Sequence, residues 1–290
     1  MAFSNTIVMS RQGKISVSDS GGTGVPLLML HGTAASKVVF ARQFDSALST
    51  RHRLIAIDLP GHGGSEIPRD PEVAYTGPGM ATVVFDVLDA LEIAKCAVFG
   101  WSLGGHIAIE MMQQHTDRLA GIILTGTPPA AHGLLGLLRA FQLRPEMLFS
   151  SKPHFTSQQA ASFARLCYGD DVTPALLESI LSSDGACRPI LFRSLAASVG
   201  ESQKRIVEQS PLPIAMINGR NEPIARLSYL ESLHYQRLWG GACHVIDGAG
   251  HAPFLQRADR FNQLTGRFLA DLQGIGTVAP AAPLRASARA

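Results

Sequence analysis

The sequence contains little that would build a metal or redox site. Its four cysteines stand far apart and form no C-x-x-C pair, which gives no support to a zinc or redox motif of that type. The ten histidines are scattered, with no H-E-x-x-H and no H-x-H-x-D-H run. We therefore expect no metal and no cofactor, and we expect four buried or free thiols in a reducing compartment: Cys96, Cys167, Cys187 and Cys243.

Strong charge and long apolar runs are also absent. The net charge is +2 with neutral histidines, so electrostatics gives no reason to expect nucleic acid or an acidic membrane as a partner. No apolar run reaches the roughly 18 residues that span a bilayer. The N-terminus lacks the basic and apolar regions of a signal peptide. The sequence predicts a soluble cytoplasmic protein with a small-molecule substrate, and it does not indicate an oligomeric state.

Short apolar runs, in contrast, alternate with helical patterns along much of the chain. Hydrophobic residues make up 46% of the 290 residues, enough for one large domain or a domain with an insertion. Apolar strands bounded by glycine and proline and separated by helices indicate an α/β fold with a mostly parallel sheet covered on both faces. The predicted strands are 6–9 and 15–18 at the sheet edge, then 26–30, 53–57, 96–99, 121–124, 213–217 and 243–246; the main helices are 79–91, 103–115 and 257–272.

The alternation stops after the adjacent prolines Pro128 and Pro129. Residues 128–207 show no clear strand and contain helical segments rich in leucine, phenylalanine and alanine, such as 134–143 and 158–167. We therefore expect an inserted helical cap at 128–207 that interrupts one core. The predicted core is 1–127 and 208–273, and the Ala/Pro/Arg-rich residues 274–290 are predicted to be a disordered tail.

The first catalytic candidate is Ser102, in the sequence Gly100-Trp101-Ser102-Leu103-Gly104. A buried strand precedes this G-x-S-x-G and a helix follows it, which is the context of a nucleophile elbow. Small residues are needed there because a Cβ would strike neighbouring backbone. The alternative is a glycine-rich turn with an idle serine.

A serine hydroxyl needs a base, and His251 is the best candidate. It follows the last predicted strand, so it lies at the same sheet edge as Ser102. His106 lies inside the helix after the elbow and is expected to point elsewhere. His31 and His62 also lie on loops at that edge, and they are expected to shape their loops.

The base needs an acid. In enzymes with a G-x-S-x-G nucleophile elbow, that acid lies between the serine and the histidine in chain order. Glu222 follows the predicted strand 213–217 by one short loop and is the best candidate. Its alternative role is a solvated loop charge. The other carboxylates fit less well: Asp170, Asp171 and Asp184 belong to the insertion, Glu231 falls in a predicted helix, and Asp247 is too close along the chain to His251.

Acyl transfer also needs hydrogen-bond donors for the developing oxyanion. The elbow supplies the backbone N–H of Leu103. The loop that follows strand 26–30 has the sequence His31-Gly32-Thr33, and its Thr33 N–H is the second candidate. A simple turn without a catalytic role is the alternative for this loop.

Together, these motifs resemble the α/β-hydrolase-fold N-acyl-homoserine lactonases, which are metal-independent quorum-quenching enzymes. The resemblance rests on L-L-M-L-H-G, R-L-I-A-I-D-L-P-G-H-G, V-F-G-W-S-L-G-G-H-I-A-I-E-M, L-T-G-T-P-P, the run from V-E-Q-S-P to I-N-G-R-N-E-P, and H-V-I-D-G-A-G-H-A-P-F. It covers roughly residues 7–270 and is weakest in the insertion. It implies an α/β-hydrolase fold with a Ser102–Glu222–His251 triad and oxyanion donors at Thr33 and Leu103.

The chain departs from the family pattern at two positions. Thr33 stands where the pattern has asparagine, which preserves a backbone donor but not a side-chain amide. Phe163 stands where a tyrosine is expected, and Tyr168 is nearby but offset. Both departures bear on how a lactone is held.

The first functional hypothesis is therefore a serine hydrolase that opens the lactone of N-acyl-homoserine lactones. An esterase or other small-acyl hydrolase with the same triad is the second, and a non-catalytic ligand receptor is the third. A dehalogenase or epoxide hydrolase is disfavoured, because their elbows carry Asp in place of Ser102. Candidate substrate-binding residues, which could equally form the insertion's own core where they belong to it, are Gly32, Trp101, Leu134, Leu137, Phe141, Met147 and Phe163.

Overall fold

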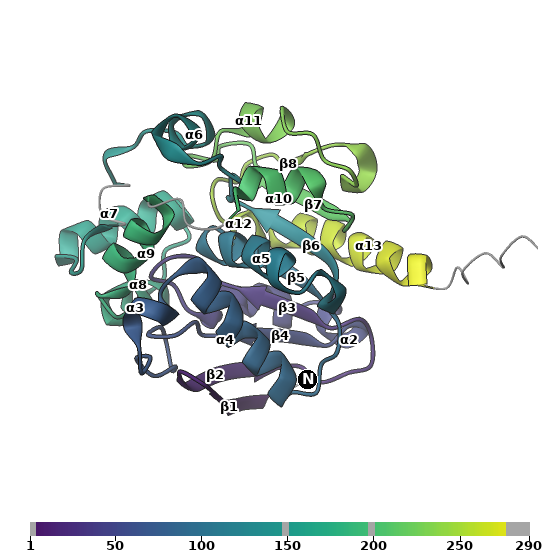
Figure 1. The fold of residues 1–290 in the computed structure, drawn as a ribbon, viewed down its shortest axis with the longest axis horizontal. Coiled ribbons are helices and arrows are strands. Elements are labelled where there is room, and N and C mark those ends of the chain that lie inside the picture. The colour runs from purple at the N-terminus through teal and green to yellow at the C-terminus, as the bar shows by residue number, and fades with distance from the viewer. Residues whose placement is uncertain (1–3, 147–150, 197–200, 277–290) are drawn as a thin grey trace, which may run out of the picture.

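A computed structural model describes residues 4–146, 151–196 and 201–276 (Figure 1). Its centre is an eight-stranded sheet in the order β1-β2-β4-β3-β5-β6-β7-β8. All neighbouring pairs from β4 to β8 are parallel, whereas β1–β2 and β2–β4 are antiparallel. The strands are β1 (Ser4–Ser10), β2 (Gly13–Asp19), β3 (Leu27–Leu30), β4 (Leu54–Ile57), β5 (Cys96–Trp101), β6 (Leu119–Thr125), β7 (Ile214–Gly219) and β8 (His244–Ile246).

Each predicted strand corresponds to one of these eight, and the mostly parallel sheet is confirmed. One detail of the prediction is wrong: residues 15–18 do not form an edge strand. β2 pairs with β1 on one side and with β4 on the other, so only β1 lies at that edge. The first four residues of β1 are exposed and only Val8 and Ser10 are buried, which fits a strand at the sheet edge.

Helices cover the sheet on both faces (Figure 1). The predicted helices at 79–91, 103–115 and 257–272 correspond to α4, α5 and α13. The helices are α1 (Ala41–Phe44), α2 (Ala47–Arg51), α3 (Pro71–Ala74), α4 (Gly77–Ala90), α5 (Leu103–Gln114), α6 (Gly133–Ala140), α7 (Ser157–Tyr168), α8 (Pro174–Ser182), α9 (Cys187–Ala196), α10 (Gln203–Gln209), α11 (Leu227–Glu231), α12 (Pro253–Gln256) and α13 (Ala258–Gly276).

The alternation of side chains along the strands divides the apolar core into two clusters. In β3, Leu28 and Leu30 belong to the cluster that contains the buried residues of α4, α5 and α10. Leu27 and Met29 belong to the other cluster, with the buried residues of α12 and α13. Because both faces are covered, the short strands β3 and β4 are buried at every position.

The stretch between β6 and β7 contains helices α6 to α10 and no strand in its described residues. The predicted boundary between residues 207 and 208 falls inside α10. Ile206 and Val207 of this helix pack in the same cluster as α5, so α10 lies against the core. The division into core and cap stays a prediction.

At the C-terminus, α13 continues to Gly276, so residues 274–276 are helical where a disordered tail was predicted. Residues 277–290, the rest of that predicted tail, lie outside the described residues. Over the described ranges, we find no helix that is both long enough and apolar enough to cross a membrane.

Candidate functional site

Ser102 lies on the sharp turn between β5 and α5. Its φ of 53° and ψ of −117° are unfavourable for a residue with a side chain, and its N–H donates to the carbonyl of Thr125 at 2.9 Å. Two residues on, a Cβ at Gly104 would collide with the carbonyl oxygen of Leu30. The close approach of α5 to β3 therefore requires this glycine. The observed turn has the strain and the small neighbours of a nucleophile elbow.

His251 and Glu222 form a buried pair at the same edge of the sheet. His251 Nδ1 donates to Glu222 Oε1 at 2.8 Å, and Oε2 lies 2.9 Å from the same nitrogen. Both residues are buried, with 1% and 4% of their surface exposed. His251 Nε2 is also buried and has no hydrogen-bond partner within the described part of the chain. An imidazole held in this way presents an unoccupied acceptor nitrogen.

The surroundings of Glu222 favour its ionised form. Burial alone would raise the pKa of this carboxyl group. The charge of His251 and its hydrogen bond, together with the N–H groups of Ile224 and Ala225, outweigh burial and hold the pKa below its ordinary value. Both N–H groups donate to Oε1, at 2.7 and 3.1 Å. Glu222 is therefore a fixed carboxylate rather than a solvated loop charge.

The end of β6 fits tightly against this pair. Gly126 has a φ of +60°, and a Cβ there would lie 2.6 Å from His251 Nδ1 and 3.2 Å from Glu222 Oε2. The Gly126 N–H donates at 2.8 Å to Oδ1 of Asn218, a buried asparagine in β7. The sequence prediction missed both residues. A polar asparagine inside the apolar strand I-A-M-I-N-G was the available signal for a special contact.

Trp101 connects the turn at Ser102 to the loop that carries His251. Its indole Nε1 donates to the carbonyl of His251 at 2.8 Å, and the two rings lie 5.5 Å apart. Trp101 is almost fully buried and its ring also contacts Tyr168, with centroids 5.7 Å apart. The residue before Ser102 thus holds the loop of His251 in place.

The predicted oxyanion loop lies next to the elbow. A Cβ at Gly32 would be 3.2 Å from the Cβ of Ser102. The loop contains Ala34, whose φ of 54° is a second strained non-glycine position beside Ser102. The N–H groups of Thr33 and Leu103 have no hydrogen-bond acceptor among the residues that the structure describes. Both donors are therefore available to a ligand.

The rival histidines have other contacts. His31 donates from Nδ1 to the carbonyl of Gly32 at 2.8 Å and accepts the N–H of Leu59 at Nε2 at 3.0 Å, and burial lowers its pKa. Burial also lowers the pKa of His62, to about 3. His106 faces Gln203 on α10, with Nδ1 2.6 Å from Oε1. Among the described residues, no carboxylate is hydrogen-bonded to any of these three histidines, whereas Glu222 is hydrogen-bonded to His251.

The rival carboxylates are not hydrogen-bonded to His251 in the described part of the chain. Asp247 is exposed and forms an ion pair with Arg220, with Oδ1 2.6 Å from Nε. Asp184 accepts the hydroxyl of Tyr75 at 2.6 Å. Glu231 is the last residue of α11, as the sequence predicted. Asp170 and Asp171 line an open cleft of about 520 Å³, together with Asn221, Gln256 and His251 among others.

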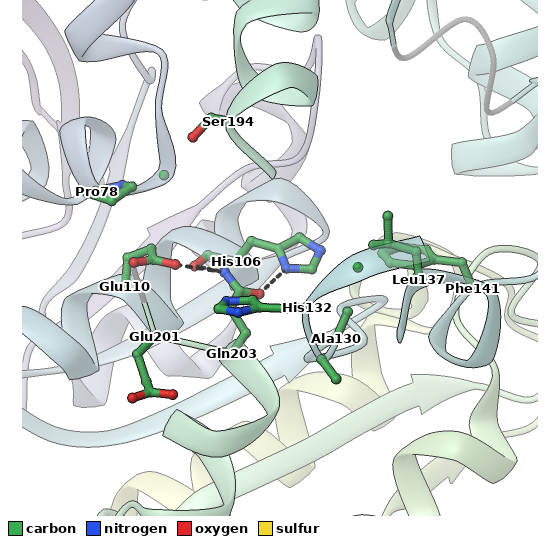
Figure 2. Close-up of a pocket in the computed structure, with 13 residues that line it drawn as sticks. Pro78, His106, Glu110, Ala130, His132, Leu137, Phe141, Ser194, Glu201 and Gln203 are labelled. Carbon is green, nitrogen blue, oxygen red and sulfur yellow. Dashed lines mark hydrogen bonds between the residues drawn. The ribbon is translucent and has the colours of Figure 1, made fainter. Parts of the chain in front are cut away.

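The predicted acyl-pocket residues do not gather at one place. Leu137 and Phe141 line a cavity of about 70 Å³ under α6, which they share with His106, Glu110 and Gln203 (Figure 2). Ser102 and His251 are not among its lining residues in the described chain. In Figure 2, the Gln203 amide lies between His106 and Glu110. Its Nε2 donates to Glu110 Oε1 at 3.0 Å.

The remaining candidates fall outside this cavity. Phe163 is buried in the same apolar cluster as Trp101 and stacks on Phe155 at 5.5 Å. Met147 lies outside the described residues, and the side chain of Leu134 is likewise not described. The described residues contain no group of three or more His, Cys, Asp and Glu side chains that could hold a metal ion.

Comparison with known protein families gives one match that spans most of the chain. Residues 25–258 match the model of the family described as alpha/beta hydrolase fold. The matched range begins just before β3 and includes Ser102, Glu222 and His251.

Individual proteins show two kinds of similarity. A solved structure of an N-acyl homoserine lactonase, a variant of AidH complexed with N-hexanoyl homoserine lactone, is 37% identical, with a TM-score of 0.90 over 93% of this chain and 99% of that chain. A 2-hydroxymuconate semialdehyde hydrolase from Pseudomonas sp. (strain CF600) is 29% identical over 86% of this chain and 88% of its own length. Esterase YbfF from Escherichia coli (strain K12) is 29% identical over 85% of this chain and 93% of its own length.

Proposed function

The chain belongs to the α/β-hydrolase fold family, and we propose that it opens the lactone ring of N-acyl-homoserine lactones by Ser102–His251–Glu222 catalysis. The observation that carries the proposal is the buried His251–Glu222 pair, which leaves Nε2 without a partner among the described residues, at the sheet edge that carries Ser102. Similarity to the lactonase AidH at 37% identity supports the choice of a lactone over other acyl compounds.

In the proposed reaction, His251 Nε2 takes the proton of Ser102 as Oγ attacks the ring carbonyl carbon. The N–H groups of Thr33 and Leu103 bind the oxyanion that forms. The ring C–O bond then breaks, and the ring oxygen takes the proton from His251 and becomes an alcohol that stays attached to the acyl-enzyme. Water, deprotonated by His251, attacks the ester; Ser102 leaves with the proton, and the product is the ring-opened acid.

Glu222 serves this reaction by holding His251 in the tautomer with a proton on Nδ1. It also stabilises the imidazolium that forms when Nε2 accepts a proton. The Ser102 hydroxyl is not hydrogen-bonded to Nε2 in this structure. Such contacts are often long before substrate binds, so the proposal requires the Ser102 hydroxyl to reach Nε2 in the substrate complex.

The test is a panel of N-acyl-homoserine lactones of increasing chain length, with proton release followed in time and product mass measured. Lactone opening adds the mass of one water without fragmentation, because the alcohol stays attached to the product. Loss of the acyl group would mean amide hydrolysis. If no lactone is opened at any chain length, the proposal is wrong.

A linear carboxylic ester is the second candidate substrate class, because esterase YbfF matches most of this chain. The same triad would cleave it, so the catalytic residues do not separate the two. The ratio of kcat/KM for a lactone to that for a p-nitrophenyl ester of equal acyl length separates them. A ratio far below one would favour the esterase.

A receptor that only binds its ligand is the third possibility, because a triad can persist without turnover. Labelling by a fluorophosphonate distinguishes it, since the probe reacts with an activated serine. We expect the wild-type protein to be labelled and Ser102→Ala to be unlabelled. An unlabelled wild type, with Ser102→Ala binding the ligand equally well, would favour the receptor.

A further inference from the structure

The acid loop, residues 222–225, is held by a segment that lies far from it in the sequence. Within the loop, Glu222 Oε1 accepts the N–H groups of Ile224 and Ala225, so the carboxylate is oriented by its own turn. The four carbonyl groups of the same turn need hydrogen-bond partners of their own. Those partners come from residues 142–144, directly after α6.

Gln142 binds three of the four carbonyl groups of this turn. Its side-chain Nε2 donates to the carbonyl of Glu222 at 2.6 Å and to that of Ala225 at 3.2 Å. Its backbone N–H donates to the carbonyl of Ile224 at 2.7 Å. Since every acceptor is a carbonyl oxygen, the orientation of the Gln142 amide is unambiguous. The fourth carbonyl, that of Pro223, receives a long contact of 3.4 Å from Arg144 Nε.

Two further contacts fix the end of α6 to the residue after the turn. The N–H of Arg226 donates to the carbonyl of Ala140 at 2.9 Å, and Arg226 Nε donates to that of Phe141 at 2.8 Å. Phe141 and Ala225 form an isolated antiparallel β-bridge. The same helix end supplies Leu137 and Phe141 to the wall of the cavity in Figure 2.

We propose that Gln142 is a positioning residue for the triad acid: by binding the carbonyl groups at both ends of the 222–225 turn, it fixes the direction in which Glu222 faces His251. The proposal rests on the assignment of Glu222 as that acid. Gln142 touches neither Ser102 nor His251 by any hydrogen bond among the described residues, so its effect passes through the turn. It also connects the wall of the α6 cavity to the catalytic pair.

The test is a double-mutant cycle of Gln142→Met with Glu222→Gln. Methionine keeps the length of the side chain and removes its donor. We expect Gln142→Met to lower kcat about tenfold through a displaced acid, with KM changed less than twofold. The limb of the kcat/KM pH profile that reports the Glu222–His251 pair should shift. In the Glu222→Gln background, the same change should lower kcat less than twofold, because no carboxylate is left to position.

Gln114→Met is the matched control. Gln114 is also half-buried, and its Nε2 donates to the carbonyl of Pro78 at 2.9 Å, at the far end of α5. We expect it to leave kcat and the pH profile unchanged. Thermal unfolding of each variant checks that it is folded. If Gln142→Met does not fold, Gln142→Asn replaces it, because the shorter amide cannot bind both carbonyls.

Each outcome decides between the proposals. A full tenfold loss that persists in the Glu222→Gln background would overturn the positioning role, as would wild-type activity of Gln142→Met. Rates are measured on a p-nitrophenyl ester as well as on a lactone. If the wild type cleaves only the ester, the lactone assignment fails and the Gln142 cycle still reports on the ester. If Glu222→Gln leaves turnover unchanged, both the triad and the role of Gln142 are wrong.

Discussion

The loops at the sheet edge and the helices after β6 differ in how completely their side chains are fixed. His251 and Glu222 are nearly inaccessible and each has hydrogen-bond partners from other elements. In α6 and its following residues, Leu135 and Leu143 are more than 70% exposed, and Phe192 of α9 is 52% exposed. The proposed chemistry thus lies in the buried, hydrogen-bonded region, and the helices carry apolar surface that the fold does not fully bury.

This difference suggests a division of tasks. A buried pair held by backbone groups tolerates little change, because an unmatched polar group in the core costs free energy. Helices with exposed apolar side chains can change in sequence with little effect on the sheet. We therefore expect the region of Ser102, Glu222 and His251 to determine the reaction, and the region of α6 to affect which acyl chains are accepted.

The largest effect should come from the proposed acid, Glu222. We expect Glu222→Gln to lower kcat by roughly 10³- to 10⁴-fold, because an amide favours the wrong tautomer of His251. Glu231→Gln, at the exposed end of α11, should change kcat less than twofold. Steady-state kinetics of both variants on one substrate provides the measurement. Equal effects of the two substitutions would show that Glu222 is not the acid.

A smaller effect should appear in the pH dependence of stability, with opposite signs for two carboxylates. The pKa of Glu222 is lowered in the folded state, so its contribution is present above its ordinary value of 4.5 and is lost as the pH falls through the folded pKa. Burial raises the pKa of Glu110, so its ionisation should reduce stability as the pH rises from 4.5 through the folded pKa.

Melting temperatures between pH 3 and pH 8, compared with those of the wild type, test this pair. Glu222→Gln should weaken the loss of stability at acidic pH. Glu110→Gln should weaken the loss of stability as the pH rises. The substituted amide still offers a carbonyl oxygen to Gln203 Nε2. The expectation fails if both variants change the profile in the same direction.

The smallest effect should come from the cavity under α6. Leu137→Trp fills the space of about 70 Å³, and we expect it to raise KM for long acyl chains about tenfold while leaving short chains unaffected. Leu135→Trp is the matched control on the same helix, because Leu135 is exposed and does not line the cavity. If long and short chains respond equally to Leu137→Trp, the cavity does not receive the acyl chain.

Much of the fold was predictable because its signals are local. Each buried strand is a short apolar run, and the G-x-S-x-G turn depends on residues that are adjacent in sequence. The position of each strand in the sheet was harder to predict. Residues 15–18 look like an edge strand by themselves, and only the tertiary structure shows that β1 pairs with them. Similarly, the boundary at 207 and 208 fell inside α10, because the sequence did not reveal that this helix packs on α5.

The candidate site likewise has a part that the sequence predicted and a part that it did not. Chain order and the scarcity of suitable carboxylates pointed to Glu222 and His251, and the structure brings the two within hydrogen-bond distance. The acyl-pocket residues of the insertion were predicted from their apolar character and their place in the chain. Neither property says which cluster a side chain joins, and Phe163 and Leu137 lie in different places.

The sequence by itself therefore determined the strand–turn–helix of Ser102 and pointed to Glu222 and His251, the two groups that pair at the same edge of the sheet. Only the tertiary structure decided how Glu222 is aimed. Its carboxylate is oriented by the N–H groups of its own turn, and the carbonyl groups of that turn are bound by Gln142, 80 residues earlier in the chain. Hydrogen bonds between segments so distant depend on how the helices pack, and no local pattern encodes them.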